Sequence, residues 1–424
     1  MAGKVEERGP RVVAAQPYGP AAAITRRAAD KLRAGHLWVY RSDVESLVPP
    51  IGTTEITGGS LVTVMDSRGI PLGTGLYGAA SQIAVRMVST ETSLTRSGYL
   101  EQLRERIVAA LVLRDEVAPE SMENDACRLI FSEADGLPGI VADRYNDLVI
   151  LQLLTQGTAQ DDVRTVLAEV IKDKLRPKTI LERPDPKIRE LEQLTAPPPG
   201  ALYSSDASPL LTSIFTINEL RFHYDASSGQ KTGAFLDQRL NYAAAARYAS
   251  GSALDICTYQ GGFAIHLAQR CQHVTGVDAS RSALEVADRN RELNPELAAK
   301  VDWIEADAFE LLREYEANGE RYDTIVLDPP AFAKSKRAAE GAMRGYKELN
   351  LRAMKMLRPG GMLVTCSCSH HVGLADFTEV VAAAASDAAR RVQVLEIRGA
   401  APDHPAVLTL PETSYLKCLI CRVG

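Results

Sequence analysis

A short apolar run ends in a carboxylate and two prolines in the segment Tyr322-Asp-Thr-Ile-Val-Leu-Asp-Pro-Pro330. The run from Thr324 to Leu327 is typical of a strand buried in a parallel sheet. The prolines can continue neither a helix nor a strand ladder, and Pro330 keeps Pro329 out of the helical region. Asp328 is therefore predicted to lie on a stiff corner just beyond the carboxyl end of a strand, where open α/β sheets bind ligands. The alternative interpretation is an ordinary turn from a strand into a loop.

An aromatic ring follows this corner, because Phe332 comes four residues after Asp328. A carboxylate, a rigid backbone and a flat ring suit a planar substrate that forms hydrogen bonds, such as a nucleobase.

Strands alternate with helical patterns from residue 253 to the end of the chain. This pattern predicts a doubly wound, mainly parallel sheet of seven strands. The last two strands have no clear helix between them, which suggests one antiparallel edge strand. The expected strands are Ala253–Thr258, Val274–Asp278, Val301–Glu305, Asp323–Leu327, Met362–Cys366, Val392–Ile397 and Tyr415–Val423.

The first turn of this sheet carries two glycines, Gly261 and Gly262, which let the backbone approach a ligand closely. The dinucleotide fingerprint G-x-G-x-x-G is absent there, which argues against a nicotinamide dehydrogenase. Three acidic residues, Asp278, Asp307 and Asp328, end the second, third and fourth strands. Each of them alone fits a cap or turn residue, but as a set they can serve a ribose, an adenine edge and a reacting group. These three acidic strand ends, taken in turn, favour S-adenosylmethionine over a dinucleotide as the ligand.

The fifth strand ends in two thiols and two imidazoles, in Val364-Thr-Cys366-Ser-Cys368-Ser369-His370-His371. These residue types can bind zinc, but no other Cys/His pair is arranged to complete such a site, and we assign no metal. The alternative is one nucleophilic thiol beyond the strand end. Cys368 lies further out and is the better candidate, whereas Cys366 is expected to pack inside the strand. Cys418 and Cys421 are expected in the core.

Composition sets the broad class of the protein. A chain of 424 residues with 46% apolar and 24% charged residues is expected to form two or three globular domains. No apolar run is long enough to span a bilayer and no signal-peptide core is present, so we expect a soluble, cytoplasmic protein without membrane contact. Seven cysteines without framework spacing indicate reduced thiols. A net charge of −6 gives no global nucleic-acid signature, so RNA contacts must use local basic patches.

The chain divides into four predicted parts: a tail at 1–20, a small β-domain at 21–95, an α+β domain at 96–207 and the α/β domain at 208–424. The β-domain combines a basic turn, Arg26–Arg33, with the aromatic residues Trp38 and Tyr40. Basic and aromatic residues together suit phosphate contacts and stacking on RNA. The alternative is a small domain with Trp38 in its core.

Four motifs together resemble one family, the PUA-domain-containing class I methyltransferases that make 5-methylcytosine in bacterial large-subunit ribosomal RNA. The resemblance covers residues 21 to 424. Its motifs are Gly229-Gln-Lys-Thr-Gly233-Ala-Phe-Leu-Asp237-Gln238-Arg239, Tyr259-Gln-Gly261-Gly262-Phe263-Ala264, Leu327-Asp328-Pro329-Pro330-Ala-Phe332 and Ser367-Cys368-Ser369.

The resemblance implies an N-terminal PUA domain, a central α+β domain and a Rossmann-like methyltransferase domain. It implies that S-adenosylmethionine is held by the Gly261 turn with Tyr259 and Gly262, by Asp278, Asp307 and Asp328, and near Gln238. It also implies Cys368 as the catalytic thiol, and we assign Phe332, Lys334 and Arg239 to substrate binding. The chain departs from the family pattern at Cys366 and at His370-His371, where a glycine often follows Ser369.

The expected reaction is methylation of cytosine carbon 5 in RNA. Hypothesis: the Cys368 thiolate adds to carbon 6, and Asp328 binds the ring edge and stabilises the adduct. The target base must be unstacked to enter such a pocket. The alternatives are methylation of uracil carbon 5, an exocyclic amine or a small molecule, and a non-catalytic RNA-binding assembly factor. An amine transferase more typically carries Asn-Pro-Pro-Tyr at the corner. The sequence leaves open whether the protein forms a homodimer.

Overall fold

The computed structural model describes residues 19–227, 233–332 and 339–424. Contacts divide the chain into two compact units. Unit 1 comprises residues 1–105, 153–166 and 186–197, and unit 2 comprises residues 106–152, 167–185 and 198–424. Within the described residues, no helix has both the length and the apolar character that a membrane crossing requires. The three folded domains predicted from the sequence, with their boundaries, stay a prediction.

Unit 1 is built on a six-stranded sheet with the order β2-β6-β5-β4-β1-β3. Apolar side chains from its strands, including Ile24, Val39 and Val64, form its core. Strands β4, β5 and β6 are consecutive in the chain and neighbours in the sheet, each pair joined antiparallel. The elements are β1 (Ala21–Ile24), α1 (Arg26–Arg33), β2 (Trp38–Tyr40), β3 (Val44–Val48), β4 (Leu61–Met65), β5 (Pro71–Tyr77), β6 (Ile83–Ser89) and α4 (Pro186–Glu192).

Trp38 and Tyr40 are half-buried in this sheet rather than enclosed in its core. They lie two residues apart on β2, so they share a face of that strand. Their rings meet edge to face with centroids 6.4 Å apart, and the Arg86 guanidinium lies 5.5 Å from the Trp38 ring. Since β2 is an edge strand of the sheet, these groups gather at its border.

Unit 2 contains a five-stranded sheet of order β11-β10-β9-β8-β7 and a hairpin, β12-β13. Strands β7 and β8 pair antiparallel. Two helices, α2 and α3, run across the division between the units. The elements are α2 (Arg96–Val117), β7 (Ala126–Phe131), β8 (Ile140–Tyr145), β9 (Leu148–Leu153), α3 (Asp161–Leu175), β10 (Thr179–Glu182), β11 (Tyr203–Ser204), β12 (Thr212–Ile217) and β13 (Leu220–Asp225).

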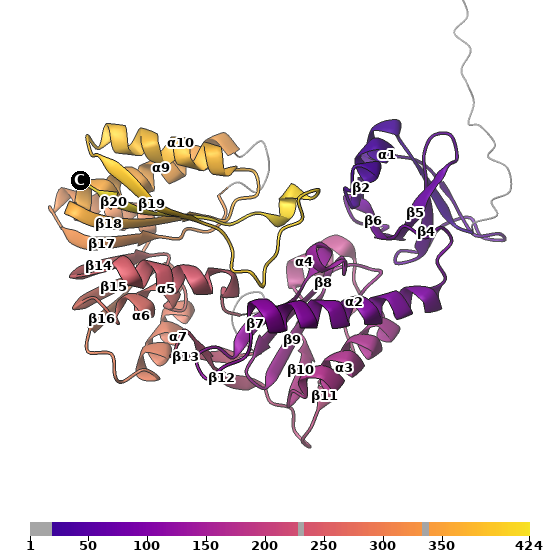
Figure 1. Cartoon of the computed structure of the whole chain (residues 1–424), viewed down its shortest axis with the longest axis horizontal. Helices are drawn as coiled ribbons and strands as arrows, with labels where there is room; N and C mark the ends of the chain where they lie inside the picture. The colour runs from indigo at the N-terminus through magenta and orange to yellow at the C-terminus, as the bar shows by residue number, and fades with distance from the viewer. Residues whose placement is uncertain (1–18, 228–232, 333–338) are drawn as a thin grey trace, which may run out of the picture. The chain divides into compact units, whose positions relative to one another are not determined.

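The second sheet of unit 2 has seven strands in the order β16-β15-β14-β17-β18-β20-β19 (Figure 1). Its elements are α5 (Arg239–Tyr248), β14 (Ser252–Ile256), α6 (Gly262–Leu267), β15 (His273–Asp278), α7 (Arg281–Glu292), β16 (Lys300–Glu305), α8 (Ala308–Ala317), β17 (Tyr322–Leu327), α9 (Ala339–Met356), β18 (Leu357–Ser367), α10 (Leu374–Asp387), β19 (Val392–Arg398) and β20 (Lys417–Val423).

Helices cover both faces of this sheet (Figure 1). On β17, Val326 packs into the cluster that contains α5 and α6, whereas Ile325 and Leu327 pack into the cluster that contains α8, α9 and α10. This alternation of neighbours explains the continuous apolar run of the segment, because a strand covered on both faces has no polar side.

The position of the antiparallel strand differs from the sequence prediction. An antiparallel edge strand was expected, but β20 lies inside the sheet, paired antiparallel with both β18 and β19. The edge strand is β19, which precedes β20 in the chain, and β20 lies between β19 and β18. Burial agrees with this order, because β20 is buried at every position but one, whereas every position of β19 is exposed or half-buried.

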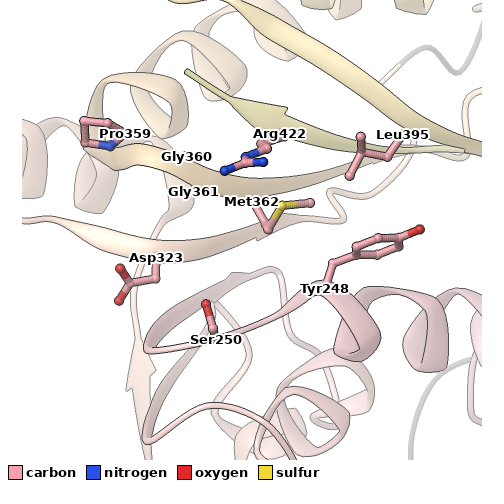
Figure 2. Close-up of a pocket in the computed structure, with 9 residues that line it drawn as sticks. All are labelled: Tyr248, Ser250, Asp323, Pro359, Gly360, Gly361, Met362, Leu395 and Arg422. Carbon is pink, nitrogen blue, oxygen red and sulfur yellow. The ribbon is translucent and has the colours of Figure 1, made fainter.

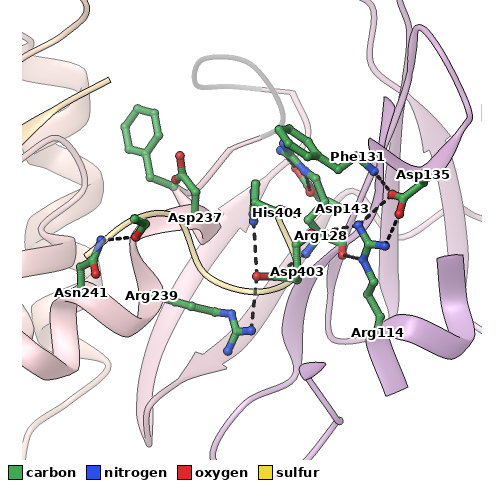
Figure 3. Close-up of polar contacts among 12 residues, drawn as sticks. Arg114, Arg128, Phe131, Asp135, Asp143, Asp237, Arg239, Asn241, Asp403 and His404 are labelled. Carbon is green, nitrogen blue, oxygen red and sulfur yellow. Dashed lines mark hydrogen bonds and ion pairs between the residues drawn. The ribbon is translucent and has the colours of Figure 1, made fainter. Parts of the chain in front are cut away.

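A network of arginine–aspartate pairs joins the two sheets of unit 2 (Figure 3). Arg114 pairs with Asp135 at 2.6 Å and also donates to the Asp403 carbonyl oxygen at 2.9 Å. The Asp403 carboxylate accepts from the Arg128 amide nitrogen at 3.0 Å and from Arg239 at 3.3 Å. Burial opposes ionisation of Asp403, but bonds with its neighbours hold its pKa well below the usual range. Removing one member would leave a buried charge without compensation.

Candidate active site

The turn between β14 and α6 is held in an uncommon backbone conformation. Cys257, Tyr259 and Gly261 all have positive φ, at 64°, 52° and 82°. Such conformations are strained for residues other than glycine and persist only where the surroundings impose them. At Gly262, a Cβ atom would lie 2.5 Å from Cζ of Tyr242, so this position has no room for a side chain. The close contact at Gly262 is with a side chain of the protein itself, and the approach of a ligand to the two glycines stays a prediction.

Asp255 is a site residue that sequence reasoning did not single out. It is fully buried in β14, and its Oδ2 accepts from Thr258 Oγ1 at 2.6 Å and from the Ala264 amide nitrogen at 2.9 Å. Its Oδ1 has no hydrogen-bond partner within the described part of the chain. Burial raises the pKa of this carboxyl to about 7. An acid inside an apolar strand was the available signal, and its unmatched oxygen suits a ligand that brings a donor or a positive charge.

Asp278 and Tyr259 are directly linked. Asp278 Oδ2 accepts from the Tyr259 amide nitrogen at 2.9 Å, and Oδ1 accepts from the Ser280 amide nitrogen at 2.9 Å. The Asp278 carboxylate therefore ties the end of β15 to the strained turn. The Tyr259 ring lies 4.9 Å from the Phe235 ring, which is partly exposed, so the two form an aromatic wall beside the turn.

The presence of an aspartate at position 307 is explained by its role in capping a helix. It is exposed at the end of β16, and its Oδ1 accepts from the amide nitrogens of Phe309 and Glu310 at 2.9 and 3.1 Å. These bonds satisfy the first turn of α8, which is the role of an N-cap residue. A contact between Asp307 and a cofactor stays a prediction.

Asp328 occupies the corner after β17, and two side-chain amides linked by hydrogen bonds hold its carboxyl group. Gln238 Nε2 donates to Asp328 Oδ2 at 3.0 Å, and Asn241 Nδ2 donates to Gln238 Oε1 at 2.7 Å. Burial, together with the charges of Asp237 and Asp255, raises the pKa of Asp328 to about 8. The carboxyl is therefore largely protonated at neutral pH and can donate a hydrogen bond, a property typical of catalytic acids. Asn241, which fixes the orientation of Gln238, was not anticipated from the sequence.

Cys368 lies beside this corner. It follows β18, is half-buried, and its Sγ is 3.8 Å from the carbonyl oxygen of Pro329, the residue after Asp328. Cys366 is fully buried in the strand opposite Cys418, and burial raises the pKa of its thiol well above the ordinary value. The structure thus separates the two cysteines: one is in the core, and the other is next to the carboxylate-bearing corner.

The three predicted substrate residues lie in different surroundings. The half-buried Phe332 ring packs 4.9 Å from the Tyr346 ring and 5.9 Å from the Phe309 ring. Lys334 lies outside the described residues. Arg239 is buried, 5% exposed, with its guanidinium directed at Asp403, so in this structure it supports the loop around Asp403 (Figure 3). RNA contacts by these residues stay predictions.

Among residues 19–227, 233–332 and 339–424, no group of three or more histidine, cysteine or acidic side chains is placed to hold a metal ion. An open pocket of about 400 Å³ lies where β17 and β18 begin, the ends opposite to Asp328 and Cys368 (Figure 2). It contains none of the predicted site residues. Its lining is Tyr248, Ser250, Asp323, Pro359, Gly360, Gly361, Met362, Leu395 and Arg422.

Comparison with known proteins adds the family. A family model described as a PUA-like domain matches residues 23–90, and one described as S-adenosylmethionine-dependent methyltransferase matches residues 189–422. Ribosomal RNA large subunit methyltransferase I of Erwinia tasmaniensis is 38% identical over 92% of this chain and 95% of its own. The protein of that name from Photobacterium profundum is 36% identical over 92% and 96%.

Solved structures share the fold. The crystal structure of SMU.776 complexed with SAH matches with a TM-score of 0.78 at 17% identity, covering 94% of this chain and 99% of that one. A methyltransferase structure from Streptococcus mutans gives 0.77 with the same coverage. The predicted α/β fold, with a PUA-like N-terminal domain and a class I methyltransferase domain, is confirmed.

The unmatched Asp255 oxygen and the glycine turn fit the cofactor that this fold uses, which is S-adenosylmethionine. The chain belongs to the family of S-adenosylmethionine-dependent methyltransferases that includes the proteins named ribosomal RNA large subunit methyltransferase I.

Proposed function

We propose that this protein methylates carbon 5 of a cytosine in large-subunit ribosomal RNA through a covalent adduct with Cys368. The RNA class is taken from the name of relatives that match 92% of the chain. The chemistry rests mainly on one observation, the placement of Cys368 Sγ 3.8 Å from the Pro329 carbonyl oxygen, beside Asp328. A thiol next to a protonated carboxyl suits attack on a pyrimidine ring, because carbon 5 of cytosine is a poor nucleophile until carbon 6 has been attacked.

Each group of the chain has a role in this scheme. The Cys368 thiolate forms a bond to carbon 6, and Asp328 donates its proton to ring nitrogen 3, which receives the displaced electron pair. Bound S-adenosylmethionine supplies the methyl group that carbon 5 accepts. The carbon 5 proton then passes to a solvent base, Asp328 recovers its proton from nitrogen 3, and the carbon–sulfur bond breaks to release the thiolate. The Gln238–Asn241 chain keeps Asp328 oriented throughout.

The residues proposed to hold the cofactor are those around the strained turn. Gly261 and Gly262 let the backbone approach it, and Tyr259 and Asp278 are fixed to each other beside them. Asp307 and Asp328 are proposed to complete the set from the next two strand ends, with Gln238 behind Asp328.

The PUA-like domain is proposed to contact RNA through the aromatic edge of β2. Trp38, Tyr40 and Arg86 gather there, and rings with a neighbouring guanidinium offer stacking surfaces for unpaired bases. The protein therefore needs no overall positive charge to bind RNA.

Labelling the RNA tests the proposed product. Unmodified large-subunit ribosomal RNA is incubated with the protein and S-adenosylmethionine that carries a labelled methyl group, and the RNA is digested to nucleosides for mass spectrometry. We expect the label in 5-methylcytidine, and no label with the Cys368→Ala variant. Label in methyluridine or in a base methylated on its exocyclic amine would contradict the assignment of the acceptor. Absence of both labelling and cofactor binding by calorimetry would instead favour a non-catalytic RNA-binding factor.

A further inference from the structure

Lys417 is a buried amine at the start of β20. It is 6% exposed, and the register of the sheet pairs it with Ser367, the residue before Cys368. Lysine is almost never fully buried unless its charge is compensated, because removing an ammonium group from water is expensive. Its position in the core of the catalytic sheet therefore requires an explanation.

Lys417 donates hydrogen bonds to two backbone carbonyl oxygens. Its Nζ donates to the Ser369 carbonyl at 2.7 Å and to the Tyr415 carbonyl at 2.6 Å. Within the part of the chain that the structure describes, it forms no ion pair with a carboxylate. An ammonium group has three N–H donors, so these two bonds leave one donor and the full positive charge. Burial lowers the pKa of Lys417 to about 8, and a negative charge on Cys368 acts in the opposite direction.

In the sequence, Cys368 lies between two residues that contact Lys417. Ser367 is the cross-strand neighbour of Lys417, and the Ser369 carbonyl oxygen accepts a hydrogen bond from Lys417 Nζ. We propose that the Lys417 ammonium is the counter-ion that stabilises the Cys368 thiolate. The thiol proton leaves to water or buffer, its contact with the Pro329 carbonyl is lost, and the negative sulfur is then balanced by the fixed ammonium. Lys417 acts here as a positioning residue, because it touches neither RNA nor cofactor in this scheme.

The tyrosines and Asp328 around Cys368 do not supply this charge. Tyr346 bonds through its hydroxyl to Ser367 and Ser369, and the Tyr415 hydroxyl donates to Asp237. Both tyrosines have a raised pKa, caused mainly by burial, so they stay neutral near pH 7. Asp328 is neutral or negative. His370, exposed and bonded to the Glu412 carbonyl, can also carry a positive charge.

The test measures the thiol directly and needs no RNA. The full-length protein is alkylated with iodoacetamide from pH 5 to 10, and modification of the peptide that contains Cys368 is followed by mass spectrometry. The midpoint of the rate against pH reports the thiol pKa, and the plateau at high pH reports access to the sulfur. A merely structural role of Lys417 would change the plateau and leave the midpoint unchanged.

Three variants separate charge from hydrogen bonding. Lys417→Gln keeps two N–H donors but removes the charge, Lys417→Arg keeps the charge, and His370→Gln removes the competing cation. We expect Lys417→Gln to raise the midpoint by about one pH unit, which slows alkylation at pH 7 about tenfold. Lys417→Arg and His370→Gln should keep the wild-type midpoint. A folded Lys417→Gln variant, checked by circular dichroism, that titrates like the wild type would overturn the proposal.

This inference rests on the proposed function only in giving Cys368 a reason to be a thiolate. If the labelling experiment fails while the alkylation midpoint still depends on Lys417, the proposed reaction is wrong and the ion pair stands. If the RNA is methylated and the midpoint is indifferent to Lys417, the reaction stands and the ion pair is wrong.

Discussion

Replacing Asp328 with asparagine should stabilise the protein at alkaline pH. The pKa of this carboxyl is raised from 3.8 to about 8, mainly by burial and then by the charges of Asp237 and Asp255. The folded state therefore holds a proton that the unfolded state has already released. Because of this difference, the free energy of unfolding of the wild type falls as the pH rises between about 4 and 8. Asparagine cannot ionise, so the variant lacks this loss.

The size of this stability difference follows from the shift in the pKa of Asp328. Roughly four pKa units correspond to about 6 kcal/mol for a group that water cannot reach. Asp328 is only half-buried, so solvent screening reduces the expected figure to about 2 kcal/mol. In a protein of this size that difference amounts to roughly 2 °C in the midpoint of thermal unfolding.

Thermal unfolding by circular dichroism, without cofactor, at pH 5 and at pH 8.5 measures this difference. Asp328→Asn should unfold about 2 °C above the wild type at pH 8.5, and most of that gain should disappear at pH 5. Asp307→Asn, which alters an exposed helix cap, is the matched control and should show no such growth with pH. A gain for Asp328→Asn that is equal at both pH values would refute the reasoning.

Two other substitutions test the cofactor turn and the arginine–aspartate network. Gly262→Ala places a methyl group 2.5 Å from Cζ of Tyr242, so it should destabilise the protein by about 1–3 kcal/mol and weaken S-adenosylmethionine binding in calorimetry. Gly341→Ala, whose added methyl group finds no atom closer than 3.9 Å, is the control; normal cofactor affinity of Gly262→Ala would contradict the account of the turn. Arg239→Ala should lower the free energy of unfolding in urea by about 3 kcal/mol, because Asp403 loses a buried partner. A loss of RNA binding without loss of stability would instead support a direct role of Arg239 in contacting RNA.

Much of the fold follows from local patterns. The apolar run before Asp328 forms β17, and the other strands of its sheet lie within a few residues of their expected positions. These predictions succeed because a buried parallel strand must be apolar on both faces and must end at a polar turn. The interior position of β20 depends on long-range pairing, which no short window of sequence contains.

The residues of the candidate site likewise divide into those that local sequence patterns indicate and those that depend on long-range packing. Residues at strand ends, such as Asp278 and Asp328, can be found from their position in the sequence. The burial of Arg239 and of Lys417 depends on segments more than a hundred residues away, or on the opposite strand. Asp255 could have been noticed as an acid in a strand, but its unmatched oxygen is visible only in the structure.

The most direct test of the central claim is to trap the adduct. RNA that contains 5-fluorocytosine is incubated with the protein and S-adenosylmethionine, and the products are separated on a denaturing gel. Fluorine at carbon 5 cannot leave as a proton does, so the carbon–sulfur bond persists. We expect a covalent band that is retained in Cys366→Ala and lost in Cys368→Ala, with the nucleotide located on Cys368 by mass spectrometry. A band that survives Cys368→Ala but not Cys366→Ala would contradict the account.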